Sequence, residues 1–230
     1  KAIGLTASTQ PSMNVKEGVT RRYEYNMDDI ALSKSDTGAK TYNAAEGIDI
    51  SNILSNVQVN GSKLTYSIAG KAAVGNTATV NITISTANYE DVTATLTITV
   101  IPKDTQTIGF EHLTITKTYG DAKFTQTAIL QGPGGTGPIT YSSDNTAVAT
   151  VNAATGEVTI VGAGSANITA TKEADDEWYA ATAVYGLVVS PKTVTITAHD
   201  KTAKVGLNQP AYTYTVTGLI TDDNLTREPT

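Results

Sequence analysis

Apolar and polar residues alternate along most of this chain, and the alternation is the main guide to its fold. In the run 77–85, Val80, Ile82 and Ile84 share one face of a strand, while threonine and asparagine residues share the other. Strict alternation of this kind predicts a β-strand with one buried face. The same pattern predicts strands over Val92–Val100, His112–Thr116, Ser165–Thr171 and Val194–Ala198. The one run with helical character is Glu173–Tyr179, and its acidic cluster predicts a loop.

Turn-forming residues separate these strands at short intervals. Asn60-Gly61, Gly75-Asn76 and Asp144-Asn145 are pairs that favour tight turns. Threonine is abundant, whereas the chain has only two phenylalanines, two methionines and one tryptophan, a composition that favours strands over helices. Many short strands with frequent turns predict an all-β fold class, built as tandem immunoglobulin-like antiparallel β-sandwiches.

Two phrases recur along the chain and indicate domain boundaries. The phrase Lys-Thr-Tyr begins at Lys40 and again at Lys117, and an alternating run ends in a Pro-Lys pair at Pro102 and again at Pro191. Proline cannot donate to a strand ladder, so it suits the end of a strand. We expect an N-terminal sandwich at 1–102 (with 1–26 partly linker or an extra strand), a second domain at 103–191 and a partial β domain at 192–230.

The middle of the second domain carries a recognisable series of motifs. Ile139-Thr-Tyr-Ser-Ser-Asp is followed by Ala147-Val-Ala-Thr-Val, by a turn at Gly156, and by Ala163-Gly-Ser-Ala-Asn-Ile. In this order the segments closely resemble the bacterial immunoglobulin-like group 2 family. The resemblance implies a β-sandwich from a tandem array on secreted or cell-surface bacterial proteins, adhesins among them. It brings no binding site, because that family has no shared ligand residues.

Neighbouring segments resemble a second family of bacterial surface repeats. Lys117-Thr-Tyr-Gly-Asp in the second unit is similar to the opening of the YGX-type (MBG) repeats. Val194-Thr-Ile-Thr-Ala-His-Asp-Lys, continuing into Tyr212-Thr-Tyr-Thr-Val, is similar to later parts of them. The resemblance implies that such repeats flank the second domain.

Charge and composition exclude several classes of function. The formal net charge is -6, and the basic residues are scattered, so we expect no nucleic-acid partner. No run approaches the roughly 18 consecutive apolar residues of a membrane span, and the chain has no cysteine for a disulfide or a thiolate nucleophile. We therefore expect no direct membrane insertion. Lys1 in place of methionine, and a pattern that stops at Thr230, indicate a piece of a longer chain.

Gly162 and Gly164 follow an apolar run, as the glycines of a nucleotide-binding loop do. Such a loop needs a third glycine and then a helix whose N-terminal amides meet the phosphate. Here an alternating run follows Gly164, so we interpret the two glycines as the corner of a hairpin that needs positive φ or close backbone approach.

Other candidates for catalysis or metal binding are weak. His112 and His199 stand in alternating runs, without the serine elbow of a hydrolase, so we interpret both as strand residues and expect no enzyme activity. Acidic clusters are expected to be solvated turns, because none has the spacing of a calcium loop; they are Asp28-Asp29, Asp175-Asp176-Glu177 and Asp222-Asp223. Calcium at the first joint, beside Asp104, stays an open alternative. Thr125-Gln126-Thr127-Ala128 resembles the signature of thioester adhesins but lacks their cysteine. No cofactor is expected.

Two pairs of tyrosines are candidates for ligand contact. Tyr23 and Tyr25 share a strand face, as do Tyr212 and Tyr214, and each pair either stacks on a sugar or covers the sandwich core. Trp178-Tyr179 is expected to be a core anchor and a rim residue. Asn-x-Ser/Thr sites are expected by chance in so threonine-rich a chain; they are Asn60, Asn81, Asn167 and Asn224.

These observations lead to one expected function and one alternative. We expect a non-catalytic tandem module of a bacterial cell-surface or secreted protein that acts as a spacer or stalk, or in adhesion. The alternative is a set of accessory domains, carbohydrate-binding ones included, of a large secreted enzyme that acts on polysaccharide. Expected partners are a host or extracellular-matrix protein or a glycan, and the chain is expected to be an extracellular monomer. The sequence identifies no ligand-binding residue.

Overall fold

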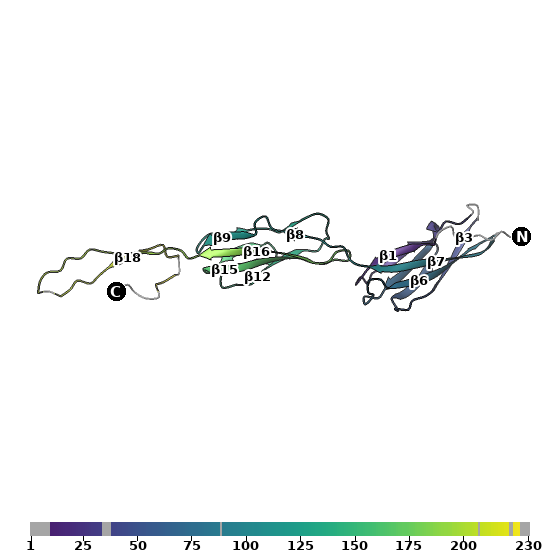
Figure 1. The fold of residues 1–230 in the computed structure, drawn as a ribbon, viewed down its shortest axis with the longest axis horizontal. Helices are drawn as coiled ribbons and strands as arrows, with labels where there is room; N and C mark the ends of the chain where they lie inside the picture. The colour runs from purple at the N-terminus through teal and green to yellow at the C-terminus, as the bar shows by residue number, and fades with distance from the viewer. Residues whose placement is uncertain (1–9, 34–37, 88, 207, 221–222, 226–230) are drawn as a thin grey trace. The chain divides into compact units, whose positions relative to one another are not determined.

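The structure is a computed structural model that describes residues 10–33, 38–87, 89–206, 208–220 and 223–225 (Figure 1). The chain forms two compact units, each treated by itself below. Unit 1 comprises Lys1–Asp104 and Asp176–Tyr179, and unit 2 comprises Thr105–Asp175 and Ala180–Thr230. Strands dominate both, so the predicted fold class of tandem immunoglobulin-like β-sandwiches is confirmed. The part of the chain that the structure describes contains no helix with the length and hydropathy of a membrane span.

Unit 1 consists of two sheets that face each other across one core. The first sheet has the order β1-β7-β6-β3, and the second has the order β2-β5-β4. A short 3-10 helix, η1, follows β2. The bounds are β1 Ser12–Lys16, β2 Arg22–Asn26, η1 Met27–Asp29, β3 Lys40–Glu46, β4 Leu54–Asn60, β5 Lys63–Ile68, β6 Thr77–Thr86 and β7 Tyr89–Ile101.

The core of unit 1 follows the alternation of its sequence. Val80, Ile82 and Ile84 on β6 are at most 1% exposed. Val80 lies opposite Leu96 on β7 in the antiparallel pairing of these strands. Leu64 and Tyr66, both 0% exposed, contribute from β5 of the facing sheet to the same apolar cluster. Successive side chains of a strand alternate between the two faces of the sheet, and only one face points to the core. The side chains on that face are apolar because their burial is favourable.

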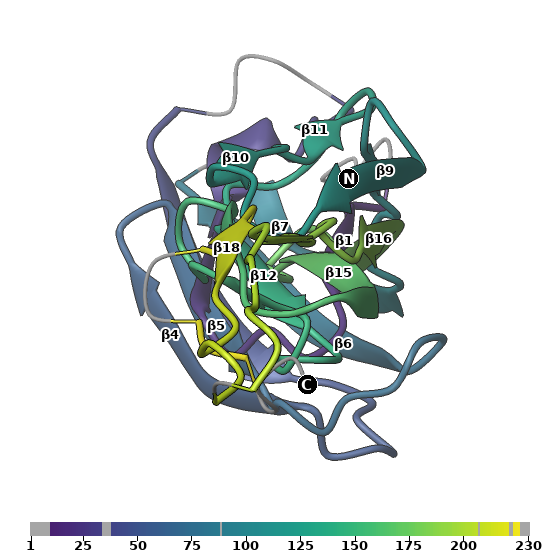
Figure 2. The same ribbon diagram turned by 90° about the vertical axis from the view of Figure 1, so that its left-hand side faces the viewer.

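Unit 2 repeats this arrangement and adds the antiparallel pair β17–β18. Its larger sheet has the order β12-β15-β16-β9, a second sheet has the order β10-β14-β13, and β11 pairs with β8. Figures 1 and 2 both show β15 and β16 side by side. These two strands pair antiparallel over nine residue pairs. The bounds are β8 Ile108–Gly109, β9 Thr114–Thr118, β10 Phe124–Thr125, β11 Ile129–Leu130, β12 Ile139–Ser143, β13 Ala149–Val151, β14 Glu157–Ile160, β15 Gly164–Lys172, β16 Ala181–Ser190, β17 Thr195–Ala198 and β18 Tyr214–Thr217.

One edge pairing in each sandwich departs from the antiparallel pattern that the sequence predicts. β1 runs parallel to β7, and β9 runs parallel to β16. In both sandwiches an early strand therefore pairs along the last one. Alternation specifies which face of a strand is buried and says nothing about its neighbour, so this pairing leaves no mark in the sequence pattern.

The glycines at the start of β15 occupy a connection between sheets, which corrects the hairpin interpretation. β14 and β15 belong to different sheets, so Gly162 and Gly164 lie where the chain crosses from one layer to the other. Gly164 has φ +142°, and a Cβ at Gly162 would lie 2.7 Å from the carbonyl oxygen of Ala147. The predicted reasons for glycine, positive φ and close backbone approach, are both confirmed.

Most other local predictions hold. Pro102 directly follows β7 and Pro191 directly follows β16, and 173–177 has no helix. The exceptions are the histidines, since His112 precedes β9 and His199 follows β17 by one residue. Each histidine lies just beyond the end of a strand, because the backbone hydrogen bonds of the strand stop before the alternation of apolar and polar residues does.

Tyr185 lies at the centre of the core of unit 2 and predicts an alkaline loss of stability. Its ring meets Phe110 edge-on, with centroids 4.8 Å apart, and burial raises its pKa to about 12. An unfolded tyrosine titrates near pH 10, so the unfolded chain releases its proton first as pH rises. The stability contribution is complete below about pH 10 and is lost towards about pH 12, amounting to up to about 2–3 kcal/mol.

A conservative variant isolates this effect. Within the described residues the Tyr185 hydroxyl has no hydrogen-bond partner, so Tyr185→Phe is expected to cost nothing near neutral pH. Urea unfolding at about pH 8 and about pH 11 is expected to show a smaller alkaline loss for Tyr185→Phe than for the parent chain. Tyr212→Phe, at a tyrosine that is 73% exposed, is the matched control. Equal alkaline losses in all three proteins would contradict the prediction.

Candidate functional site

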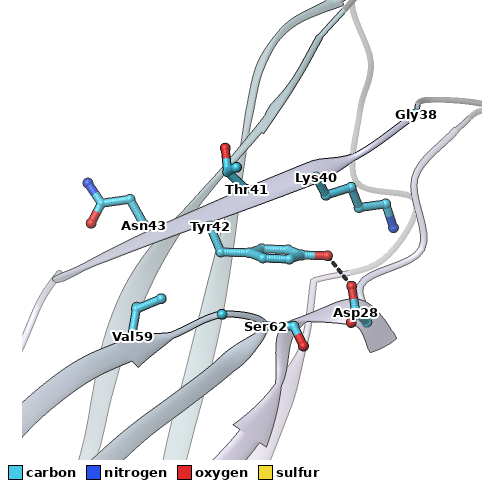
Figure 3. Close-up of a pocket in the computed structure, with 9 residues that line it drawn as sticks. Asp28, Gly38, Lys40, Thr41, Tyr42, Asn43, Val59 and Ser62 are labelled. Carbon is cyan, nitrogen blue, oxygen red and sulfur yellow. Dashed lines mark hydrogen bonds between the residues drawn. The ribbon is translucent and has the colours of Figure 1, made fainter.

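Unit 1 carries a polar cavity of about 850 Å³ at the open edge of its sandwich (Figure 3). It lies where β3, an edge strand of the first sheet, faces η1 and the turn between β4 and β5 of the second. The residues that line it are Asp28, Gly38, Lys40, Thr41, Tyr42, Asn43, Val59, Gly61 and Ser62. We call this the β3-edge cavity.

Local sequence positions the two ends of the β3-edge cavity. The side chain of Asn26 accepts a hydrogen bond of 3.2 Å from the Asp28 N–H and so starts η1, while the fully buried Met27 anchors it. Across the cavity, Gly61 with φ +61° and Ser62 form the two-residue turn between β4 and β5. The predicted turn at Asn60-Gly61 is therefore confirmed, and it places Ser62 towards Asp28.

Asp28 and Tyr42 form the polar centre of the β3-edge cavity. The Tyr42 hydroxyl donates a hydrogen bond to Oδ1 of Asp28, as Figure 3 shows. Hydrogen bonds from Tyr42 and Ser62, together with the charge of Lys40, hold the pKa of Asp28 below its usual range. Burial and the neighbouring carboxylate raise the pKa of Tyr42 above its usual range. At neutral pH the pair is thus a carboxylate and an un-ionised phenol.

The same side chains were only partly foreseen. The sequence predicts that Asp28 belongs to a solvated acidic pair, and no spacing pattern joins it with Tyr42, Lys40 or Ser62. Tyr42 lies in the recurring Lys-Thr-Tyr phrase, which is the one signal that pointed to this strand. The side chains meet only because the two sheets close on each other at this edge.

A second cavity of about 620 Å³ lies on the sheet β2-β5-β4 and is lined by residues of all three strands. Its charged side chains already have partners within the sheet. Nη2 of Arg22 lies 2.9 Å from Oε1 of Gln58, and Nζ of Lys63 lies 2.9 Å from Oε1 of Glu24. Binding a polar ligand here requires breaking these pairs, so this cavity is the weaker candidate.

Unit 1 also contains a cluster of ion pairs around its segment Asp176–Tyr179. Arg21 lies 3.0 Å from Glu177 and 3.8 Å from Asp176, and the Tyr179 hydroxyl donates to Glu17. The backbone of Asp104 accepts from the Tyr179 N–H at 2.9 Å and donates to the Glu177 carbonyl at 2.8 Å. These contacts hold the segment against the end of β7.

Loss of Arg21 is expected to loosen this segment measurably. Arg21→Ala removes two exposed ion pairs, each contributing roughly 0–1 kcal/mol, so amide exchange at Tyr179 and Asp104 is expected to accelerate several-fold. Hydrogen exchange followed by NMR is the measurement. Lys63→Ala, which removes an exposed ion pair elsewhere in unit 1, is the control. Exchange at Tyr179 that is equally slow in both variants would show that the backbone hydrogen bonds suffice.

The acidic residues considered for calcium have other partners. Asp104 lies 2.9 Å from the ammonium of Lys16, and Asp175 accepts a hydrogen bond of 2.8 Å from the Thr136 N–H. Over the described ranges, no group of three or more His, Cys, Asp or Glu side chains is placed to hold a metal ion. Asp222 lies outside the described residues, and Asp223 accepts a hydrogen bond of 3.2 Å from the Tyr119 hydroxyl.

The tyrosine pairs differ in their exposure. Tyr23 is 7% exposed and stacks on Tyr66 with centroids 5.7 Å apart, so it belongs to the core and forms no sugar platform. Tyr25 is half-buried and packs against the same core. Tyr212 is 73% exposed, next to a half-buried Tyr214 on β18. Trp178 is half-buried rather than the expected core anchor, because its segment pairs with Asp104.

The histidines and Gln126 serve local structure. The ring of His199 lies within hydrogen-bond distance of the hydroxyls of Thr213 and Thr215, at 3.1 and 2.6 Å. Gln126 is 9% exposed, and its amide both accepts from the His112 N–H and donates to the His112 carbonyl. The His199 contacts join the segments that carry β17 and β18. The Gln126 contacts join two segments of the second sandwich.

Comparison with known proteins connects part of unit 2 to a bacterial family. Residues 118–175 match the family described as intimin, immunoglobulin-like domain, which supports the expected bacterial immunoglobulin-like domain. No curated protein matches the chain.

Similar solved structures are extracellular cadherin domains. Domains EC1–3 of mouse clustered PcdhgC3 are 14% identical, with a TM-score of 0.35, and the match covers 82% of this chain and 67% of that one. Domains EC1–2 of human protocadherin-24 are 13% identical (TM-score 0.33; 83% and 98% covered). Domains EC1–4 of Drosophila N-cadherin are 11% identical (TM-score 0.32), and the chain spans 48% of their length.

Proposed function

We propose that this chain is a non-catalytic tandem module of a bacterial cell-surface or secreted protein that acts as a spacer or in adhesion. The observation that carries the proposal is the match of residues 118–175 to the immunoglobulin-like domain of intimin. The group 2 and MBG resemblances of the sequence, and its three-part division at Pro102 and Pro191, belong to the same proposal. An extracellular monomer is the expected state.

The way the sandwiches are built supports this role. Each unit has its own apolar core, made by its own inward-facing strand residues. A fold of this kind is stabilised by the burial of its apolar side chains and by the backbone hydrogen bonds of its long strands. Such modules serve as durable spacers that present a binding surface without performing chemistry.

Surface labelling tests the proposal directly. Antibodies raised against the 230-residue chain are applied to intact cells of the bacterium that encodes it, and to the concentrated culture medium. We expect label on unpermeabilised cells or protein in the medium. Label that appears only after permeabilisation, with none in the medium, would contradict the proposal. A control antibody against a cytosolic protein reports leakage.

A further inference from the structure

We propose that the β3-edge cavity of unit 1 is a binding site for a neutral pyranose sugar, with Asp28, Tyr42, Lys40 and Ser62 as the recognising side chains. The proposal goes beyond the spacer and adhesion role, which stands whether or not this site binds a ligand. The proposed site does not use the tyrosine pairs that the sequence suggested for sugar stacking, since Tyr23 of the first pair is buried in the core.

The lining of the β3-edge cavity supplies hydrogen-bond donors and acceptors. A carboxylate offers about four lone-pair sites, and the hydroxyl of Tyr42 engages Asp28 at one of them. The remaining capacity accepts from the hydroxyls of a sugar, while the ammonium of Lys40, on the same face of β3 as Tyr42, supplies N–H donors. Sugar hydroxyls both donate and accept, so they match a lining that offers both functions.

The β3-edge cavity combines a polar lining with an aromatic ring. Small-molecule pockets are mostly apolar, whereas polar side chains dominate the β3-edge cavity. Its apolar surface comes from Val59 and from the half-buried ring of Tyr42, which extends across the cavity towards Asp28 (Figure 3). A pyranose ring has the matching character, because its edges carry hydroxyls and its C–H face packs on an aromatic ring.

The charge and the size of the β3-edge cavity suit a neutral small molecule. Asp28 and Lys40 carry opposite charges, so the lining is neutral and favours neither an anion nor a cation. The volume of about 850 Å³ falls within the range of roughly 300–1,000 Å³ that small-molecule sites occupy. The position of Asp28 is set by its hydrogen bonds before any ligand arrives, which lowers the cost of binding.

NMR titration of the 230-residue chain tests the site. The probes are the methyl glycosides of glucose, galactose, mannose and N-acetylglucosamine, with glucuronate as an anionic probe. We expect at least one neutral glycoside to give saturable amide shifts at residues 40–43 and 61–62, with a dissociation constant on the order of 1 mM. Saturation by glucuronate alone, shifts confined to other residues, or no saturable shift with any glycoside would overturn the proposal.

Two variants separate recognition from folding. Asp28→Asn keeps the shape of the side chain and removes its charge, and Tyr42→Phe keeps the ring and removes the hydroxyl. Each is expected to weaken binding about tenfold, as the loss of a hydrogen bond involving a charged group does. Glu46→Gln, an exposed carboxylate change on β3 outside the cavity, is the control and is expected to bind as the parent does. Parent-like affinity in both cavity variants, with unchanged thermal unfolding, would refute the assignment of these residues.

Discussion

Leu96→Ala is expected to lower the free energy of unfolding of unit 1 by about 2–5 kcal/mol, the usual cost of removing a buried leucine. Leu96 is 0% exposed and lies opposite Val80 in the longest antiparallel pairing of the unit. The loss combines the transfer free energy of the deleted carbons with the cavity left behind. Strands on both sides hold the backbone in place, so the cavity collapses little.

Urea unfolding followed by fluorescence measures the effect, because Trp178 is the only tryptophan and belongs to unit 1. Thr93→Ala provides the matched control, since Thr93 lies on the same strand and points outwards. The control is expected to change the free energy of unfolding by no more than about 0.5 kcal/mol. A loss below about 1 kcal/mol for Leu96→Ala would show that this position is not part of the cooperative core.

The contrast between these two positions shows what sequence patterning predicts well. One face of each long strand is buried, so burial imposes period two on the sequence, and Val80, Ile82 and Ile84 were assigned to the core on that basis. The pattern does not say whether the strand face that carries Tyr23 and Tyr25 points to the core or to solvent. Tyr23 and Tyr25 share a face as predicted, but that face is the inner one, because Tyr23 stacks on Tyr66.

The sequence pattern also predicts neither the partner of each strand nor the candidate site, for a related reason. Local alternation contains no information about which strand lies beside which, so the parallel pairs β1–β7 and β9–β16 were not predicted. Tyr42 lies on β3 of the first sheet, and Asp28 lies on η1, which follows β2 of the second sheet, so the two side chains meet only when the sandwich closes. A site assembled across two sheets has no spacing motif, whereas the turn at Gly61 that shapes it is local and was predicted.

Gly164→Ala is expected to destabilise unit 2 by roughly 2–5 kcal/mol, through two effects that act at one residue. Its φ of +142° lies in a region that residues with a Cβ rarely adopt. An added Cβ would also lie 2.8 Å from Cγ2 of Val148, a side chain that is 5% exposed and branched at Cβ. Because Val148 is buried and stiff, it has little freedom to move away.

A glycine on the paired strand makes the matched comparison for Gly164→Ala. A Cβ at Gly186 on β16 would have no neighbour closer than 3.9 Å, so Gly186→Ala is expected to be neutral or to stabilise by up to about 1 kcal/mol. Urea unfolding followed by circular dichroism, with hydrogen exchange of the β15 and β16 amides, distinguishes the two variants. Equal stabilities would mean that the crossing between sheets accepts an ordinary residue. The expected difference instead identifies the glycine after Ala163 as a requirement of the inter-sheet crossing, which explains a motif that superficially resembles a phosphate-binding loop.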